Sequence, residues 1–541
     1  ILAVLVRTPA DGLAPVIDRL LASNDCAQQI LALQVALAGG LRVDPGRLAT
    51  LRNSQAVPVA LLARLVAGDT TGDIAPETAD LATGEILIET VALAARPAVA
   101  RLVVSVVRDG PPALRARGLV ALAALPRAPD GSATALAETL SADRDPAVRA
   151  AALRLLALAP GPGRLARLVA ALEDPDRRVR RAAAEALSML NDEALDALRD
   201  TAIDAPDQRW EATVWALEAM QSRPAQRLLR ALLAPTLERA AENAALLRQL
   251  PAARDPALWR PLDVALADSN QRLVERMLKV LAALPRNRVV VQLRRALAST
   301  DLRTRADAIE ALASLPDRRL IAAALPLVEA VSLGNVASGS ASPVPDRGPL
   351  AALVLERAGH SWDVWVRRGA AAVRCTCARG LSEPPAHGFT RVDATEVDME
   401  QLLFLKRIPL FGSLSLDTLL ALSRVLATES YVAGETVFAD GSPGHCLYLI
   451  RSGMLEVRKD QRLLSRLGAG TYVGEMALID DAPRSASVVV TEDCTLLRLD
   501  RAAFEDLTED YPAMLRELCR MLAFNLREAN RRLAVLAPLA E

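Results

Sequence analysis

Charged and apolar positions recur in a fixed order between about residue 110 and residue 380. An acidic residue follows a short turn, an arginine comes four residues later, and a helix rich in Ala and Leu continues. Because an acid stabilises a helix N-terminus and residues i and i+4 share a face, we expect each acid to begin a helix, with its arginine on the same face. The pairs are Asp145 and Arg149, Asp176 and Arg180, Asp268 and Arg272, Asp301 and Arg305, and Asp363 and Arg367.

The shorter intervals, from Asp145 to Asp176 and from Asp268 to Asp301, are about 30 residues, the length of a helical hairpin with its turns. One hairpin cannot bury its apolar face alone, so we expect the hairpins to stack into an α-solenoid over residues 1–382. A non-repetitive helical bundle is the competing interpretation.

The stretch "DPAVRAAAL", from Asp145 to Leu153, resembles the second helix of HEAT-type repeats. The resemblance is weaker near the N-terminus, where Val16–Leu21 and Ile30–Leu37 still predict helices. The resemblance to HEAT-type repeats covers residues 109–187, 268–315 and 363–378 and fades over residues 1–108.

The helical pattern is interrupted twice by residues typical of flexible segments. "SLGNVASGSASPVPDRGP" predicts a flexible loop at about 334–349, and "GLSEPPAHGF" begins a linker at 383–397. From Tyr431 the apolar residues alternate instead, and glycines punctuate short β-rich runs at intervals of roughly ten residues, as in a small barrel or jelly roll. We therefore predict a multidomain α + β protein with an N-terminal α-solenoid and a C-terminal β jelly-roll barrel with flanking helices.

The C-terminal domain is predicted over residues 398–541, with its barrel at about 428–500. Helices are expected on both sides of the barrel, from Asp398 to Ala427 and from Arg501 to Leu536, the latter filling residues 501–537.

Composition narrows the classes of function. The 64 basic and 65 acidic residues are dispersed, with no basic block, so we expect neither nucleic-acid binding nor a membrane-surface patch. Six sparse cysteines indicate a reducing compartment and a cytoplasmic protein. Cys375 and Cys377 with His387 lack a second ligand pair, so no metal site is expected. The most apolar long stretch, Ile86–Val107, is interrupted by charges and does not predict a membrane span.

The stretch "VGEMALIDDAPRSASVVV" holds the residues with the most specific chemistry. Gly474 permits a tight turn after which a short helix, Met476–Ile479, can begin, and such a helix start attracts an anion. Arg484 offers a planar fork of donors for phosphate oxygens. Glu475 repels a bare phosphate but would accept hydrogen bonds from sugar hydroxyls, so the combination indicates a nucleotide.

This run resembles the phosphate-binding cassette of cyclic-nucleotide-binding domains. The glycines and the "LYLI" stretch from Gly434 to Gly453 resemble the same family's strand and turn signature. The resemblance implies that Glu475 binds the ribose 2′-hydroxyl and Arg484 the cyclic phosphate. The expected ligand-binding residues are Gly474, Glu475, Met476, Ala477, Arg484, Ser485 and Ala486.

The resemblance favours cAMP as ligand and leaves cGMP open, because Ser485 directly after the arginine can help accept guanine in the family. The base lid is expected from the last helix, and Phe524, Asn525 or Arg527 are candidates to reach the base. The apolar stripe of that helix alternatively packs on the barrel or on a second subunit; it consists of Leu515, Leu518, Leu522, Leu526, Ala529 and Leu533. In a decayed barrel, by contrast, Arg484 would only pair with Asp480 or Asp481.

No catalytic constellation, Walker-type P-loop or kinase signature occurs, so we expect a protein that is not an enzyme. After the long last helix we find no helix-turn-helix pattern, and DNA binding is not expected. The leading hypothesis is a cyclic-nucleotide sensor whose barrel regulates a protein-interaction surface, with an unidentified protein partner, on the helical repeats. The alternatives are a scaffold with a non-binding barrel and the soluble regulatory tail of a membrane nucleotide-transporter-like protein, whose membrane part would precede Ile1.

Overall fold

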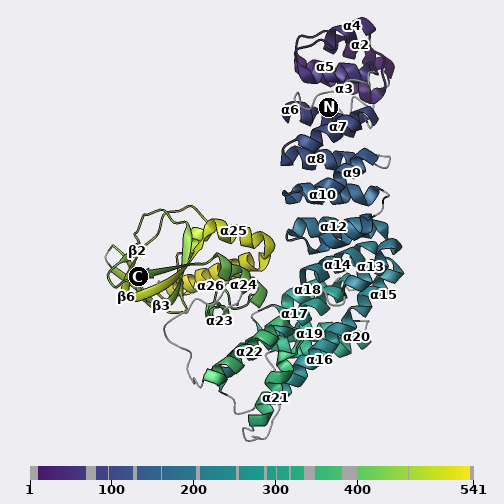
Figure 1. The fold of residues 1–541 in the computed structure, drawn as a ribbon. Coiled ribbons are helices and arrows are strands. Elements are labelled where there is room, and N and C mark those ends of the chain that lie inside the picture. Colours follow the sequence, from purple (N-terminus) through teal and green to yellow (C-terminus); the bar gives the residue numbers. More distant parts are fainter. Residues whose placement is uncertain are drawn as a thin grey trace. The chain divides into compact units, whose positions relative to one another are not determined.

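The computed structural model places most of the chain in helices followed by one sheet (Figure 1). The described residues are 10–68, 81–94, 97–125, 131–159, 161, 163–202, 207–250, 255–284, 289–299, 301–315, 318–333, 348–379, 399–460 and 462–536. The predicted loop at 334–349 lies almost wholly outside them, and so does the predicted linker at 383–397. No helix of the described part is both long and apolar enough to cross a membrane.

The chain divides into two compact units that do not follow the predicted boundary at residue 382. The first unit holds residues 1–232 and 283–286, and the second holds residues 233–282 and 287–541. The two units are defined by contacts between residues and do not test the predicted domain boundaries, which stay a prediction.

The first unit is a stack of helices, of which α8, α10, α12 and α14 pack successively on one another. Its helices are α2 (Ala10–Leu21), α3 (Cys26–Gly39), α4 (Pro45–Leu51), α5 (Val57–Val66), α6 (Leu81–Ala94), α7 (Pro97–Asp109), α8 (Pro112–Ala123), α9 (Gly131–Leu140), α10 (Pro146–Leu158), α11 (Arg164–Ala170), η2 (Ala171–Glu173), α12 (Arg177–Leu190), α13 (Asp192–Ala202), α14 (Asp207–Met220) and α15 (Arg223–Ala231). The helices expected at Val16–Leu21 and Ile30–Leu37 lie within α2 and α3.

The second unit begins with further helices and ends with the sheet. The helices before the sheet are α16 (Leu233–Gln249), α17 (Pro256–Ala283), α18 (Val289–Leu297), α19 (Leu302–Ala313), α20 (Arg318–Leu333), α21 (Gly348–Gly359), α22 (Val364–Arg379), α23 (Met399–Arg407) and α24 (Leu416–Val425). The sheet and the last elements are β1 (Ala427–Tyr431), β2 (Thr436–Phe438), β3 (Cys446–Lys459), β4 (Arg462–Gly468), β5 (Tyr472–Val473), η3 (Glu475–Leu478), β6 (Ser487–Asp500), α25 (Arg501–Asp510) and α26 (Pro512–Leu536). We call residues 399–536 the sheet domain.

The recurring acids behave as predicted at four of the five positions. Asp145, Asp176 and Asp301 accept hydrogen bonds from the first N–H groups of α10, α12 and α19. Asp363 does the same for α22, accepting from the Trp365 N–H at 2.8 Å. These side chains satisfy N–H groups that lack a partner within the helix, which fixes where each helix begins.

The prediction is wrong for Asp268, which lies in the middle of α17. The polar run around it resembles a turn in sequence, but its side chains make buried contacts instead. Asn243 of α16 donates to Ser269 Oγ and to Asn270 Oδ1, both at 2.9 Å. The Asn243 amide group thus binds two side chains of the polar run, and α17 continues through the run without a break.

The recurring arginines mostly bind backbone carbonyls rather than their own acid. Arg149 donates to the carbonyls of Asp143 and Arg144, at 2.9 and 3.1 Å. Arg180 and Arg367 each bind two carbonyls of the turn that precedes their helix in the same way. The arginine therefore supplies donors for carbonyls that the turn leaves without a helical partner.

Arg149 also links neighbouring repeats, since its Nε and Nη2 both lie 2.8 Å from the Asp174 carboxylate. We expect Arg149→Ala to lower the free energy of unfolding by about 1.5–3 kcal/mol, the usual contribution of hydrogen bonds to charged groups. Arg154→Ala on the same helix is the matched control, because its pair with Glu185 is exposed and worth about 0.2–1 kcal/mol. Urea unfolding followed by circular dichroism checks this, and equal losses in the two variants would contradict it.

The sheet is antiparallel and six-stranded, with the order β1-β6-β3-β4, while β2 pairs with β6 and β5 with β3. Residues of β3 alternate between two cores: Leu447 and Leu449 join one, and Tyr448 and Ile450 join the other. This alternation follows from the two-residue period of a strand. The predicted fold class, a helical N-terminal region followed by a β domain with flanking helices, is thereby confirmed.

Both predicted flanking helices are interrupted. The helix expected from Asp398 to Ala427 consists of α23 and α24, separated by residues 408–415, which include Pro409 and Gly412. The helix expected from Arg501 to Leu536 breaks at Tyr511, after which Pro512 begins α26. Proline lacks the N–H that would continue a helix, so it marks the start of the second one.

Candidate functional site

The turn at Gly474 positions the candidate site. Its φ of 87° is left-handed, and a Cβ there would lie 2.3 Å from Arg484 Nη1. Glycine is therefore required both for the backbone conformation and for the space it leaves to the arginine. The short helix expected at Met476–Ile479 is a 3-10 helix one residue earlier, η3 at Glu475–Leu478.

The structure brings the predicted ligand residues together around η3 and the start of β6. Ala477 and Ala486 are buried, at 4% and 8% exposure, whereas Met476 and Ser485 are exposed. Glu475 is half-buried, and its carboxylate makes no hydrogen bond or ion pair within the described part of the chain. Among the described residues, the carboxylate is therefore free to accept hydrogen bonds, and it directly follows Gly474, whose carbonyl Arg484 binds.

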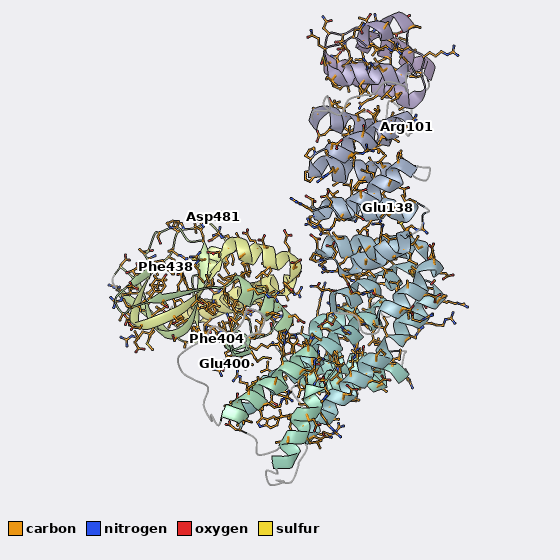
Figure 2. The ribbon with its side chains drawn as sticks, in the orientation of Figure 1. Arg101, Glu138, Glu400, Phe404, Phe438 and Asp481 are labelled. Carbon is orange, nitrogen blue, oxygen red and sulfur yellow. The ribbon has the colours of Figure 1, made fainter. Side chains whose placement is uncertain are left out.

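Arg484 is the most unusual group of the site, because its side chain is charged and nearly buried at 7% exposure. Nη2 donates to the Cys446 carbonyl at 2.8 Å and Nη1 to the Gly474 carbonyl at 3.4 Å. The guanidinium lies 4.1 Å from the centre of the Phe438 ring, which is labelled in Figure 2. Nε is buried without a partner, and no carboxylate of the described residues pairs with the group.

The structure does not support the alternative in which Arg484 only pairs with a nearby aspartate. Neither Asp480 nor Asp481 pairs with it; Asp481 instead contacts Arg501, the first residue of α25. Arg501 Nε also donates to the Ala477 carbonyl at 2.6 Å, and its Nη2 donates to the Gly444 carbonyl at 3.2 Å. Arg501 thus ties η3 to α25, while Arg484 has no carboxylate partner among the described residues.

Phe438 and Arg501 contact the site, but no pattern in the sequence predicts their roles. Phe438 is the last residue of the three-residue strand β2, which is too short for its sequence to predict which side chains Phe438 contacts. In the structure its ring stacks on Tyr448, with ring centroids 6.2 Å apart. Arg501 lies at a helix start, where an arginine is ordinarily a surface residue. Only the packing of α25 on η3 brings Arg501 to the site.

The last helix contributes less of its predicted stripe than expected. Leu518 is buried at 1% exposure, but Leu515 and Leu526 are exposed, at 49% and 63%, and Ala529 is exposed as well. Leu522 is partly buried, and the side chain of Leu533 lies outside the described residues. Within this chain, Leu515, Leu526 and Ala529 are therefore not packed on the sheet domain, and the buried positions of α26 include Met514, Leu518 and Met521. Packing of the stripe on a second subunit stays a prediction.

Asn525, one of the lid candidates, contacts Tyr472, which precedes the turn at Gly474 by two residues. Tyr472 of β5 has its pKa raised by burial and by the charge of Glu475, while a hydrogen bond with Asn525 lowers it. Phe524, in contrast, is exposed at 56%. Asn525 therefore lies next to a residue that contacts the site, and the lid itself stays a prediction.

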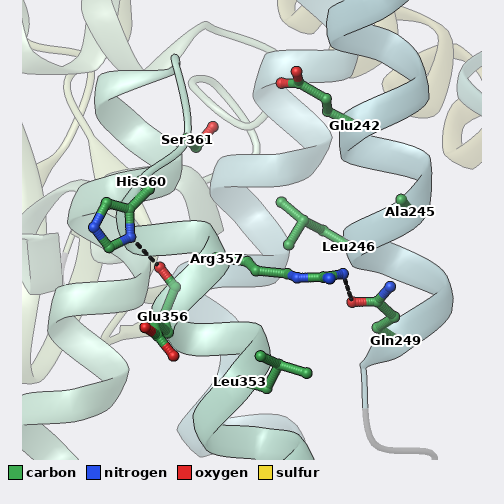
Figure 3. A pocket seen from close by; sticks show the side chains of 9 residues that line it. All are labelled: Glu242, Ala245, Leu246, Gln249, Leu353, Glu356, Arg357, His360 and Ser361. Atoms are coloured by element: carbon green, nitrogen blue, oxygen red, sulfur yellow. Dashed lines mark hydrogen bonds between the residues drawn. The ribbon is translucent and has the colours of Figure 1, made fainter.

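A separate hollow of about 570 Å³ lies between α16 and α21 (Figure 3). Arg357 Nη1 donates to Gln249 Oε1 across it at 2.8 Å, and His360 Nδ1 lies 2.9 Å from the Glu356 carbonyl. Most of its lining side chains are exposed, and it shares no residue with η3 or β6.

Cys375 and Cys377 are both exposed on α22, and His387 lies outside the described residues. Within the described ranges, no cluster of three or more His, Cys, Asp or Glu side chains is arranged to hold a metal ion.

Two protein families match parts of the chain. Residues 428–511 match the cyclic nucleotide-binding domain, and residues 132–218 match HEAT repeats. The chain therefore carries HEAT repeats in its helical region and a C-terminal cyclic nucleotide-binding domain. The HEAT resemblance expected at 268–315 and 363–378 lies outside the matched range and stays a prediction.

The relatives of the C-terminal domain are cAMP-binding regulators. The chain is 37% identical to the "Cyclic AMP receptor protein" of Thermus thermophilus over 25% of this chain and 64% of the relative. It is 34% identical to a "cAMP-dependent protein kinase regulatory subunit" of Hypocrea atroviridis over 21% of this chain and 24% of the relative. Among solved structures, the regulatory domain of Toxoplasma gondii PKA with cAMP is 32% identical, covering 21% of this chain and 48% of that one at a TM-score of 0.20.

The chain covers less than two thirds of the length of these relatives. The domain is thus related to the cyclic AMP receptor protein and to the kinase regulatory subunits.

Proposed function

We propose that the chain is a non-enzymatic sensor that binds a cyclic mononucleotide in its sheet domain and regulates protein interactions of its helical repeats. The observation that carries the proposal is Arg484, a nearly buried guanidinium with no carboxylate partner among the described residues. Burying an unpaired charge costs several kcal/mol, so such a group is expected where an anionic ligand supplies the missing charge.

Glu475 supports a nucleotide rather than a simple anion as that ligand. Its unpaired carboxylate lies on η3, directly after the turn that contacts Arg484, and it would repel inorganic phosphate. A ribose hydroxyl would donate to it, while the cyclic phosphate binds the guanidinium in a charge-assisted contact. The relatives named for cAMP make cAMP the favoured ligand, and the exposed Ser485 leaves cGMP as the second choice.

Calorimetric titration of the purified chain with cAMP and with cGMP tests the proposal. We expect saturable binding, tighter for cAMP, and a Kd that rises by about 10- to 140-fold in Glu475→Gln, because a hydrogen bond to a charged group contributes about 1.5–3 kcal/mol. Glu505→Gln is the matched control, since it removes one exposed carboxylate of α25 and should leave Kd unchanged. No heat with either nucleotide, in a protein whose circular dichroism shows that it is folded, would instead support a scaffold with a non-binding sheet domain.

A further inference from the structure

The N-terminus of α24 is bonded directly to two helices of the preceding helical region. Asp268 of α17 accepts from the Leu416 N–H, the first of α24, at 2.9 Å. The next residue, Asp417, accepts from the indole Nε1 of Trp365 in α22, also at 2.9 Å. Two adjacent residues of the sheet domain are therefore held by side chains from two different helices.

One arginine joins the carboxylates of this contact. Arg272 of α17 lies 3.0 Å from Asp268, 2.6 Å from Asp363 and 3.7 Å from Asp417. The side chains of Asp268 and Asp363 are 3% and 0% exposed. We call these four residues, with Trp365, the α24 junction. Removing one member would leave a buried partner unsatisfied, so the junction fixes the position of α24 closely.

Apolar packing runs from this junction to the candidate nucleotide site. Leu478, the last residue of η3, is buried in the same core as Phe504 of α25, Leu419 of α24 and Trp365 of α22. Near η3, Arg501 adds polar contacts to this packing, because this first residue of α25 donates to the Ala477 and Gly444 carbonyls. A continuous set of packed residues thus connects η3 through α25 and α24 to α22 and α17.

From this connection we infer that nucleotide binding is coupled to α22 and α17, and that the bond between Asp417 and Trp365 carries the coupling out of the sheet domain. The inference rests on the proposed function. A ligand that orders η3 restricts the motion of Leu478 and Arg501. This restriction passes to α25 and α24, which contact these two residues, and then to the α24 junction. Coupling between sites is reciprocal, so an altered junction also changes the affinity for the nucleotide.

Hydrogen–deuterium exchange of the full chain, with and without saturating cAMP, tests the inference. We expect cAMP to slow exchange in the peptides of residues 473–486 and also in α24 and α22. In Trp365→Phe, which keeps an aromatic ring but removes the N–H, cAMP should still protect residues 473–486 while the protection of α22 is lost. Asp417→Ala provides a second variant, because it removes the acceptor of the indole hydrogen bond from a half-exposed side chain without opening the core.

Trp215→Phe is the matched control, since Trp215 lies in α14, its ring contacts the guanidinium groups of Arg177 and Arg181 of α12, and it takes no part in the junction. It should leave the protection of α22 by cAMP unchanged. Protection of residues 473–486 without any change in α22 of the unaltered chain would overturn the inference but not the proposed function. Full protection of α22 by cAMP in both junction variants would also overturn the inference but not the proposed function. Absence of cAMP protection at residues 473–486 would overturn both.

Discussion

Replacing Arg484 with alanine should raise the Kd for cAMP by about 10- to 140-fold, or about 1.5–3 kcal/mol, as expected for the loss of a charge-assisted contact. The guanidinium is held by the Cys446 and Gly474 carbonyls and lies over Phe438, so it is already oriented before a ligand binds. The variant loses both the charge and this orientation. Calorimetric titration measures the change.

The matched control for Arg484→Ala is Arg462→Ala, which removes an exposed arginine of β4 in the same domain and changes the net charge equally. Its Kd should equal that of the unaltered chain. If both variants weakened binding to the same degree, general electrostatic attraction rather than a specific phosphate contact would explain the effect. Unaltered binding in Arg484→Ala would remove the main support for the proposed site.

Replacing Trp365 with alanine should lower the free energy of unfolding by about 3–5 kcal/mol, the usual loss for a large aromatic residue in a core. Trp365 is 1% exposed and packs in the core that α22 shares with α24 and the sheet. Its removal leaves a cavity and deprives Asp417 of the indole donor. Urea unfolding followed by circular dichroism should show an earlier transition.

Trp215→Ala serves as the control for the effect of losing a tryptophan. Its ring is half-buried and lies 5.4 and 6.0 Å from the guanidinium groups of Arg177 and Arg181, so we expect a loss of about 1–2 kcal/mol. Equal losses of unfolding free energy in the two variants would show that the core around Trp365 is not more closely packed than the surface of the helical stack.

The periodicity of the sequence predicted the fold class because local rules decide most of it. An aspartate before an Ala/Leu run caps a helix wherever its neighbours leave N–H groups unpaired, as at Asp145 and Asp301. At Asp268 the same rule failed, because tertiary partners on α16 and α24 satisfy the polar run inside one long helix. Such partners come from distant parts of the chain and leave no periodic signal.

The candidate site was predicted from a motif, and its supporting residues were not. Gly474, Glu475 and Arg484 occur at spacings that few other functions require, and the structure gathers them around η3. Phe438 and Arg501 contact the motif only through the pairing of strands and the packing of α25. Their residue types are ordinary at a strand end and a helix start, so the sequence alone does not single them out.

The shared core has a consequence for dividing the chain into separate pieces. Helices α22, α23 and α24 and strand β3 contribute residues to one continuous apolar cluster, and the Trp365 indole inside it donates to Asp417, which follows residues 380–398. A fragment that begins after residue 398 would expose the apolar side chains of α23 and α24 that pack in this cluster and would leave Asp417 without its indole donor. The sheet domain is therefore best expressed together with α22 and α17.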